Sequence, residues 1–219
     1  MGDQQVRTQP GPVTADDVDE VVAAAVLALG TRVDRDWRVS ASGLDWDCWE
    51  TVEHVADDLF AYAAQLTAKH PPLTRYVPID APARRPGGPR SALFGDPEAG
   101  PEGLVQVLDA CGGLLSSVVR TTAPTVRAFH PSGVSDAEGF AAMGLVEALV
   151  HLHDVAPVLA FDWVPSEELC DRVLYRLFPT APAGTDRWTT LLWATGRAEL
   201  PDRPRLTQWR WNGEPRLPA

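Results

Sequence analysis

The segment from Met143 to Ala156 is mostly apolar, yet it contains carboxylates and an imidazole at helical spacing. Glu147, His151 and Asp154 are separated by four and three residues, so on an α-helix their side chains share one face. Burying such polar groups costs free energy unless a partner neutralises them. A divalent metal is a partner of this kind, so Glu147 and His151 are candidate metal ligands.

A second predicted helix supplies a further imidazole, His54, at the edge of its apolar stripe. Metal sites in helix bundles are built from inward side chains of facing helices, often with a carboxylate and a histidine one turn apart. Two imidazoles and one carboxylate suit a borderline divalent ion; we expect zinc first, with nickel or iron as alternatives. Three protein ligands leave room for water or substrate, as in catalytic zinc sites.

Asp58 and Asp154 each lie one helical turn from a histidine. We expect each carboxylate to orient its imidazole through the ring nitrogen that does not bind the metal. His153 projects from a different face of its helix, and we do not expect it to be a ligand. By spacing alone the alternative is a structural role, because E-x-x-x-H pairs are common in helices and a single half-buried histidine such as His54 usually binds no metal.

Hydrophobic periodicity predicts two long helices in the first third of the chain. The first covers about residues 14–34, with Thr14 as its N-cap. The second begins at Asp45 or Asp47 and ends at His70, since the residue before a proline resists the α conformation.

Two further long helices are predicted in the middle of the chain. The third begins at Pro101, a favoured first helical residue. The fourth covers about residues 136–156, with Ser135 and Glu138 as a capping box and Pro157 at its end. The fold class is therefore all-α, an up-down four-helix bundle with crossover loops.

The remaining segments complete the predicted organisation. Residues 1–12 form a disordered leader, 13–160 the metal-binding bundle, and 161–219 an extension. In the extension, short helices start near Pro165 and Asp186, and the Asn212-Gly213 turn signal predicts a short strand or hairpin within 205–214. The segment 71–100, rich in proline, glycine and arginine, is either a solvated mobile loop or a loop whose arginines hold an anionic substrate.

Composition narrows the classes of function. The chain has 219 residues with 45% hydrophobic residues, enough for one core, and a net charge of −11, which argues against nucleic acid or an anionic membrane as a partner. Cys48, Cys111 and Cys170 lie far apart without a CxxC motif, so we expect neither disulfides nor thiolate zinc. We expect no signal peptide, no membrane span and a cytoplasmic location.

Three segments, 49–59, 146–156 and 188–197, resemble the N-terminal domain family of mycothiol-dependent maleylpyruvate isomerases, which belongs to the DinB-like superfamily of metal-binding four-helix bundles. The segments run from Trp49 through His54 to Leu59, from Val146 through Glu147 and His151 to Ala156, and from Trp188 to Arg197. The resemblance implies a His-Glu-His metal triad at His54, Glu147 and His151. It also implies a mycothiol-type thiol as cosubstrate.

Two functions follow as hypotheses. The first is a divalent-metal-dependent enzyme that uses the thiol for isomerisation or S-transfer on a small electrophile; in the isomerase version, the thiolate adds to a cis double bond and eliminates after rotation. The second is a non-catalytic metal-binding bundle with a sensor, stress or interaction role. Some family members carry a further C-terminal α/β domain, which we do not expect to fit in residues 161–219. We expect small molecules as partners, and a homodimer as one arrangement.

Overall fold

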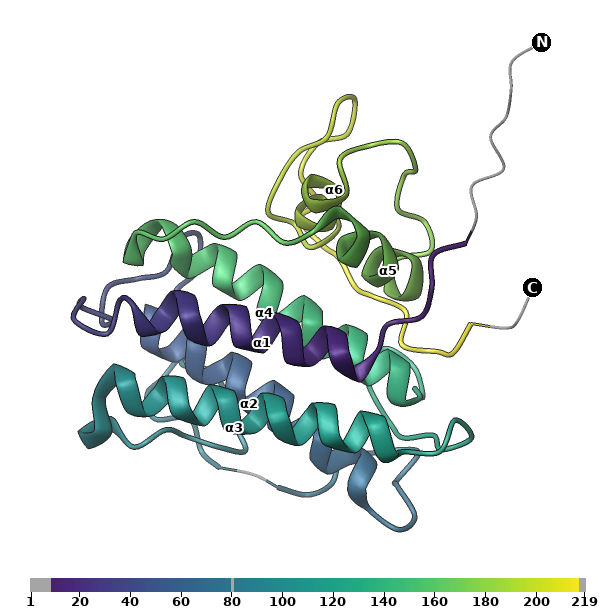
Figure 1. Ribbon diagram of the computed structural model, residues 1–219, viewed down its shortest axis with the longest axis horizontal. Helices are drawn as coiled ribbons and strands as arrows, with labels where there is room; N and C mark the ends of the chain where they lie inside the picture. The colour runs from purple at the N-terminus through teal and green to yellow at the C-terminus, as the bar shows by residue number, and fades with distance from the viewer. Residues whose placement is uncertain (1–8, 80, 217–219) are drawn as a thin grey trace.

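The computed structural model describes residues 9–79 and 81–216, and the first eight residues of the predicted leader lie outside this range. Four long helices lie side by side (Figure 1). They are α1 (Ala15–Gly30), α2 (Cys48–Thr67), α3 (Gly100–Thr121) and α4 (Ala137–Leu159), with a short 3-10 helix, η1 (Pro97–Ala99), directly before α3. The described residues form no sheet, only isolated β-bridges, so the all-α prediction is confirmed.

The four helices surround one core. α1 and α2 each pack against both α3 and α4, which places α1 and α2 at opposite corners of the bundle. The segment between Gly30 and Cys48 therefore crosses the end of the bundle to connect them. This crossing brings residues 42–46 over the end of α4, where the backbone N–H of Ser42 donates to the carbonyl of Asp154 at 2.8 Å.

The first two helices begin as their sequences predict. Thr14 caps α1, with Asp17 bonding back to the cap backbone. Asp47, and not Asp45, caps α2 through the amide of Glu50. Both arrangements satisfy amide groups that have no partner inside the helix.

The predicted start of α4 agrees with the structure to within one residue, but its predicted capping box and its predicted end are wrong. Asp136 is the N-cap, since its side chain accepts from the amide of Gly139, whereas Ser135 donates to the carbonyl of Gly213 and Glu138 accepts from the amide of Val13. At the other end, α4 continues through Pro157 to Leu159. The proline side of the helix is exposed, so water can satisfy the carbonyl that loses its partner.

α4 is the central helix of the bundle. From Gly139 to Ala156 every residue except His153 is buried. The helix is long and apolar enough to cross a membrane, as is Pro97–Thr121, but 83% of the apolar window of α4 lies buried inside the protein. Its apolar composition is therefore accounted for by the core that it fills.

The extension holds α5 (Glu167–Leu177) and α6 (Arg187–Ala194), as predicted, but its tail forms no hairpin. The backbone N–H of Asn212 donates to the carbonyl of Leu177, and that of Gly213 donates to the carbonyl of Ser132. Both residues of the predicted turn therefore bond to other segments of the chain and do not pair two strands. The buried Arg176 on α5 also bonds the carbonyls of Gly213 and Glu214. These contacts fix the tail along the bundle.

The arginine-rich loop between α2 and η1 is held on α2. Arg84 pairs with Glu53 at 3.2 Å, and Arg85 pairs with Glu50 at 2.5 Å. Farther along, the carboxylate of Asp57 accepts from the amides of Ala92 and Leu93. Arg84 and Arg85 thus bind the loop to the outer side of α2 and do not face the cavity described below.

Candidate metal centre

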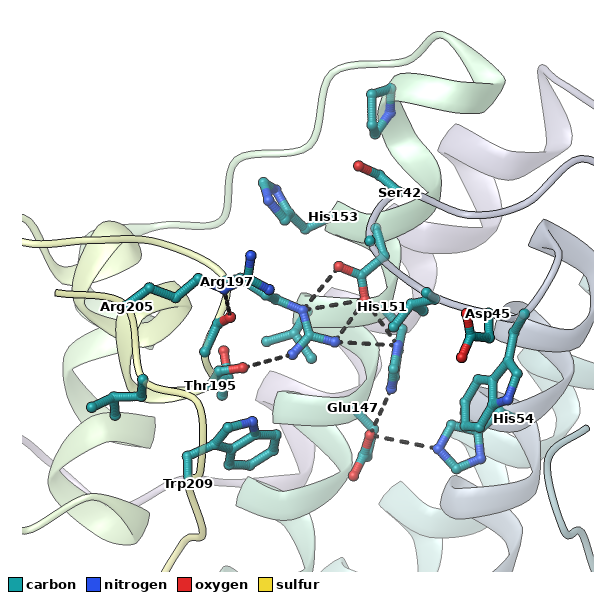
Figure 2. Close-up of a pocket in the computed structure, with 18 of the residues that line it drawn as sticks. Ser42, Asp45, His54, Glu147, His151, His153, Thr195, Arg197, Arg205 and Trp209 are labelled. Atoms are coloured by element: carbon teal, nitrogen blue, oxygen red, sulfur yellow. Dashed lines mark hydrogen bonds and ion pairs between the residues drawn. The ribbon is translucent and has the colours of Figure 1, made fainter. Parts of the chain in front are cut away.

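Three side chains from two helices converge at the centre. His54 of α2 and Glu147 and His151 of α4 place their donor atoms within 4.8 Å of one another. The Glu147 Oε2 atom lies 3.3 Å from His151 Nε2 and 4.0 Å from His54 Nε2 (Figure 2). The structure thus brings together the three residues that the sequence singles out as ligands.

Asp154 fixes which ring nitrogen of His151 faces Glu147. The Asp154 Oδ2 atom lies 3.1 Å from His151 Nδ1, and a carboxylate only accepts, so Nδ1 carries a hydrogen. In the neutral ring, Nε2 then presents a lone pair toward a carboxylate oxygen at 3.3 Å. Two lone pairs at this distance repel, so either a proton or a cation belongs between them. Asp154 thus contacts the ring nitrogen of His151 that does not face Glu147. Its role in orienting His151 toward a metal stays a prediction.

The electrostatics of the centre favour a cation. Burial raises the pKa of Glu147, but the hydrogen bond and charge of His151 more than offset it, so the net shift is downward. Burial lowers the pKa of His151, yet its bonds to Asp154 and Glu147 raise the pKa overall. Glu147 therefore favours its ionised form and His151 its protonated form, so the centre attracts positive charge, which a metal ion would also supply.

The His54 ring differs from the His151 ring in its pKa and in its hydrogen bonding. Burial lowers the pKa of His54 to about 4, so this ring is neutral near pH 7 and free to bind a metal. Its Nδ1 atom has no hydrogen-bond partner among the described residues. Packing orients the ring in place of a hydrogen bond: the Trp46 ring meets it edge-on at 4.9 Å between centroids, and the His151 ring at 5.2 Å.

The prediction for Asp58 is wrong in one respect. Its Oδ2 atom lies 3.2 Å from His54 Nε2, the same nitrogen that faces Glu147. Asp58 therefore cannot orient the ring through the remote nitrogen, as the helical spacing suggested. Spacing of four residues places two side chains on one face but does not determine which ring nitrogen the carboxylate meets.

The triad lies in the wall of a cavity of about 1000 Å³. The crossing segment supplies Asp45 on one side of the cavity, and the residues after α6 supply Arg197, Arg205 and Trp209 on the other (Figure 2). Ser42 and Trp46 of the crossing segment also line the cavity. A volume of this size suits a small-molecule ligand. The cavity combines acidic, basic and aromatic side chains from segments that are far apart in the sequence.

His153 also lines this cavity, although it is not part of the triad. It lies half-buried, with its ring against Trp188 at 5.6 Å between centroids. Its helical position, two residues after His151, directs it away from the other donors, as predicted.

Arg197 is the main residue of the site whose role the sequence does not predict. It follows Gly196, which adopts a φ of 71° after α6, and reaches back to α4. Its Nη2 atom lies 2.6 Å from Asp154 Oδ2, and its Nε atom 2.9 Å from Asp154 Oδ1. Asp154 is buried and Arg197 is partly buried, so Arg197 compensates the charge of the carboxylate that holds His151.

Comparison with known proteins gives a likeness of fold. No family model matches the sequence, and a search of curated protein sequences finds no match. Among solved structures, the crystal structure of the mycothiol-dependent maleylpyruvate isomerase matches with a TM-score of 0.53 and 14% identity, over 89% of this chain and 98% of that chain. A histidine-to-alanine mutant of the isomerase matches with a TM-score of 0.51 and the same identity and coverage.

These matches show that the chain shares the fold of that isomerase. The match covers 98% of the solved chain, so nearly all of that chain has a counterpart in this protein. At 14% identity the likeness concerns the fold, and the chemistry must be argued from the residues of the site.

Proposed function

We propose that this protein is a divalent-metal-dependent enzyme that uses a low-molecular-weight thiol of the mycothiol type. The thiol serves either to isomerise a small electrophile or to carry out S-transfer on it. One observation carries the proposal. His54, Glu147 and His151 converge, with both Nε2 atoms toward one carboxylate, in the wall of a cavity of about 1000 Å³. A donor set of two imidazoles and one carboxylate, open to a cavity, is typical of catalytic zinc sites.

The residues fit a metal by their chemistry. Zinc is the first expectation, with nickel or iron as alternatives. When bound, the ion would lower the pKa of a thiol ligand and make the thiolate available near neutral pH. No cysteine of the protein takes part: Cys48, Cys111 and Cys170 are all buried, and burial raises the pKa of each thiol to about 11 or 12.

The other residues of the cavity have distinct roles in the proposal. Asp154 holds His151 in the tautomer that leaves Nε2 free, and Arg197 holds Asp154. Arg205 lies at the cavity wall, with its Nε atom bonded to the carbonyl of Gly196. The guanidinium group suits an electrophile that carries a carboxylate.

A resemblance of fold to a mycothiol-dependent isomerase supports the thiol. The alternative is a bundle that binds a metal without turnover, as a sensor or interaction domain. A cavity of this volume favours the enzyme, because it gives a small molecule direct access to the side chains that would hold the metal.

The experiment is a thiol titration of the zinc-loaded and the metal-free protein by calorimetry. Mycothiol, glutathione and cysteine serve as probes, and S-methylated forms of each serve as controls that cannot give a thiolate. The proposal expects one thiol to bind the loaded protein at least tenfold more tightly than the metal-free protein, with the preference lost on S-methylation. Equal binding of every probe with and without zinc contradicts the thiol-dependent function.

A further inference from the structure

The two helices of the centre offer matching pairs of donors. On α4, Glu147 and His151 are four residues apart, and on α2, His54 and Asp58 are four residues apart. Each helix therefore presents one imidazole and one carboxylate on the face toward the other helix. The triad uses both donors of α4 but only one donor of α2.

The distances within each pair suit a common ion. Two donors of a tetrahedral zinc ion with bonds of about 2.0–2.1 Å lie about 3.3–3.4 Å apart. His151 Nε2 and Glu147 Oε2 lie 3.3 Å apart, and His54 Nε2 and Asp58 Oδ2 lie 3.2 Å apart. The Asp58 contact thus has the length of one edge of the coordination tetrahedron, on the nitrogen that faces the triad.

The charge of the centre points the same way. In the described part of the chain, the side chains paired with Asp58 and Glu147 are the imidazoles of His54 and His151. His54 is neutral near pH 7, so it supplies no positive charge to either carboxylate. Arg197 is bonded to Asp154 instead. A divalent ion with two imidazoles and two carboxylates forms a neutral complex, which burial favours over a charged one.

Asp57, the neighbour of Asp58, is not an equivalent donor. The donor atoms of His54, Asp57 and Asp58 also lie within 4.8 Å of one another. However, Asp57 Oδ1 already accepts from the amides of Ala92 and Leu93, at 2.7 and 2.8 Å. None of the described residues of the loop donates such a bond to Asp58, so its carboxylate is less constrained than that of Asp57.

We infer that Asp58 is a fourth protein ligand of the metal, in addition to His54, Glu147 and His151. The group of His54, Glu147 and His151, whose donor atoms lie within 4.8 Å of one another, does not include Asp58. Metal binding therefore has to draw the Asp58 carboxylate toward Glu147. Four protein ligands do not exclude a substrate, because zinc in catalytic sites sometimes expands to five ligands, and nickel and iron accept six. The inference rests on the proposed metal centre.

The test compares Asp58→Asn with Asp45→Asn. Asp45 lines the same cavity, and among the described residues its side chain forms no ion pair with a proposed ligand, so the control removes the same charge without removing a donor. Zinc affinity is measured by competition with a chromophoric chelator, and the coordination geometry from the visible absorption of the cobalt-substituted proteins. We expect Asp58→Asn to bind zinc at least tenfold more weakly than wild type and to change the cobalt spectrum, whereas Asp45→Asn matches wild type on both.

A zinc-bound crystal structure of the wild-type protein provides a measurement that needs no variant. The inference expects Asp58 Oδ within about 2.0–2.2 Å of the ion. A water in that position, with Asp58 still on His54, overturns it, as does an Asp58→Asn protein with wild-type affinity and spectrum. Failure of the wild type to bind any metal overturns the proposed function instead, so the two failures are distinguishable.

Discussion

Arg197 and Asp154 form a partly buried ion pair that joins the segment after α6 to α4. The Arg197 Nη2 atom lies 2.6 Å from Asp154 Oδ2, and the same Oδ2 atom lies 3.1 Å from His151 Nδ1. One carboxylate therefore connects His151, a proposed metal ligand, with a residue from the extension. Through this connection, the extension helps to set the orientation of His151.

Replacement of Asp154 by Asn should weaken metal binding without removing a ligand. The amide keeps the shape of the side chain but loses the charge that holds both Arg197 and the Nδ1 hydrogen of His151. Loss of such a partner typically costs about 10–100-fold in metal affinity.

Zinc affinity by chelator competition measures this effect. Asp162→Asn, at an exposed position with the same change in net charge, is the matched control and should match wild type. If Asp154→Asn also keeps the wild-type affinity while its circular dichroism is unchanged, Asp154 does not position His151.

Adjacent glycines on α3 should respond to alanine with opposite signs. A Cβ atom at Gly112 would lie 2.5 Å from the Val22 side chain, whereas one at Gly113 meets nothing within 4 Å. Gly112→Ala overpacks the contact between α1 and α3 and should cost about 1–3 kcal/mol. Gly113→Ala removes a helix-interior glycine at an exposed position and should add about 0.5–1 kcal/mol.

Urea unfolding of the two variants measures the difference directly. Because the positions are neighbours in one helix, effects of helix propensity cancel between them. Equal stability of the two variants would show that α1 does not approach α3 as closely as the structure has it.

His130 should make the stability of the protein depend on pH. Burial lowers the pKa of His130 to about 4, below its ordinary value of 6.5. Between these values the unfolded chain binds a proton that the folded protein does not, so the free energy of unfolding falls as the pH falls from 6.5 to 4. The shift corresponds to roughly 3 kcal/mol over the whole window.

The measurement is the difference in unfolding free energy between wild type and His130→Asn across this window. The Asn oxygen can replace Nδ1 as the acceptor for the amide of Ser132, so the variant keeps the local bond but does not titrate. Other titrating groups are common to both proteins and cancel. A difference that stays constant from pH 6.5 to pH 4 would be inconsistent with a buried, neutral His130.

The sequence predicts the helices well where local chemistry decides their ends. Thr14 and Asp47 cap α1 and α2 because their acceptors are the nearest side chains to the free amides. At α4 the same logic fails, because Ser135 and Glu138 bond Gly213 and Val13, which are distant in the sequence. A capping pattern cannot show that a tail will compete for its side chains.

The site divides in the same way. Glu147 and His151 share one helix, so their spacing predicts their proximity, and His54 could be added because bundle sites draw on facing helices. The role of Arg197 could not be predicted from spacing, because its contact with Asp154 depends on how the segment after α6 packs. The same holds for Trp46, whose contact with His54 depends on the crossing segment.

The central claim is that His54, Glu147 and His151 bind one divalent metal in a folded bundle. The direct measurement is the metal content, by mass spectrometry, of wild type, His151→Ala and His153→Ala after zinc loading and dialysis. His153 lies on the same helix and in the same cavity but outside the triad. The account predicts one zinc per chain in wild type and His153→Ala, and loss of zinc with the helical circular dichroism retained in His151→Ala. Wild-type protein without stoichiometric zinc, or His151→Ala protein that keeps it, would contradict the account.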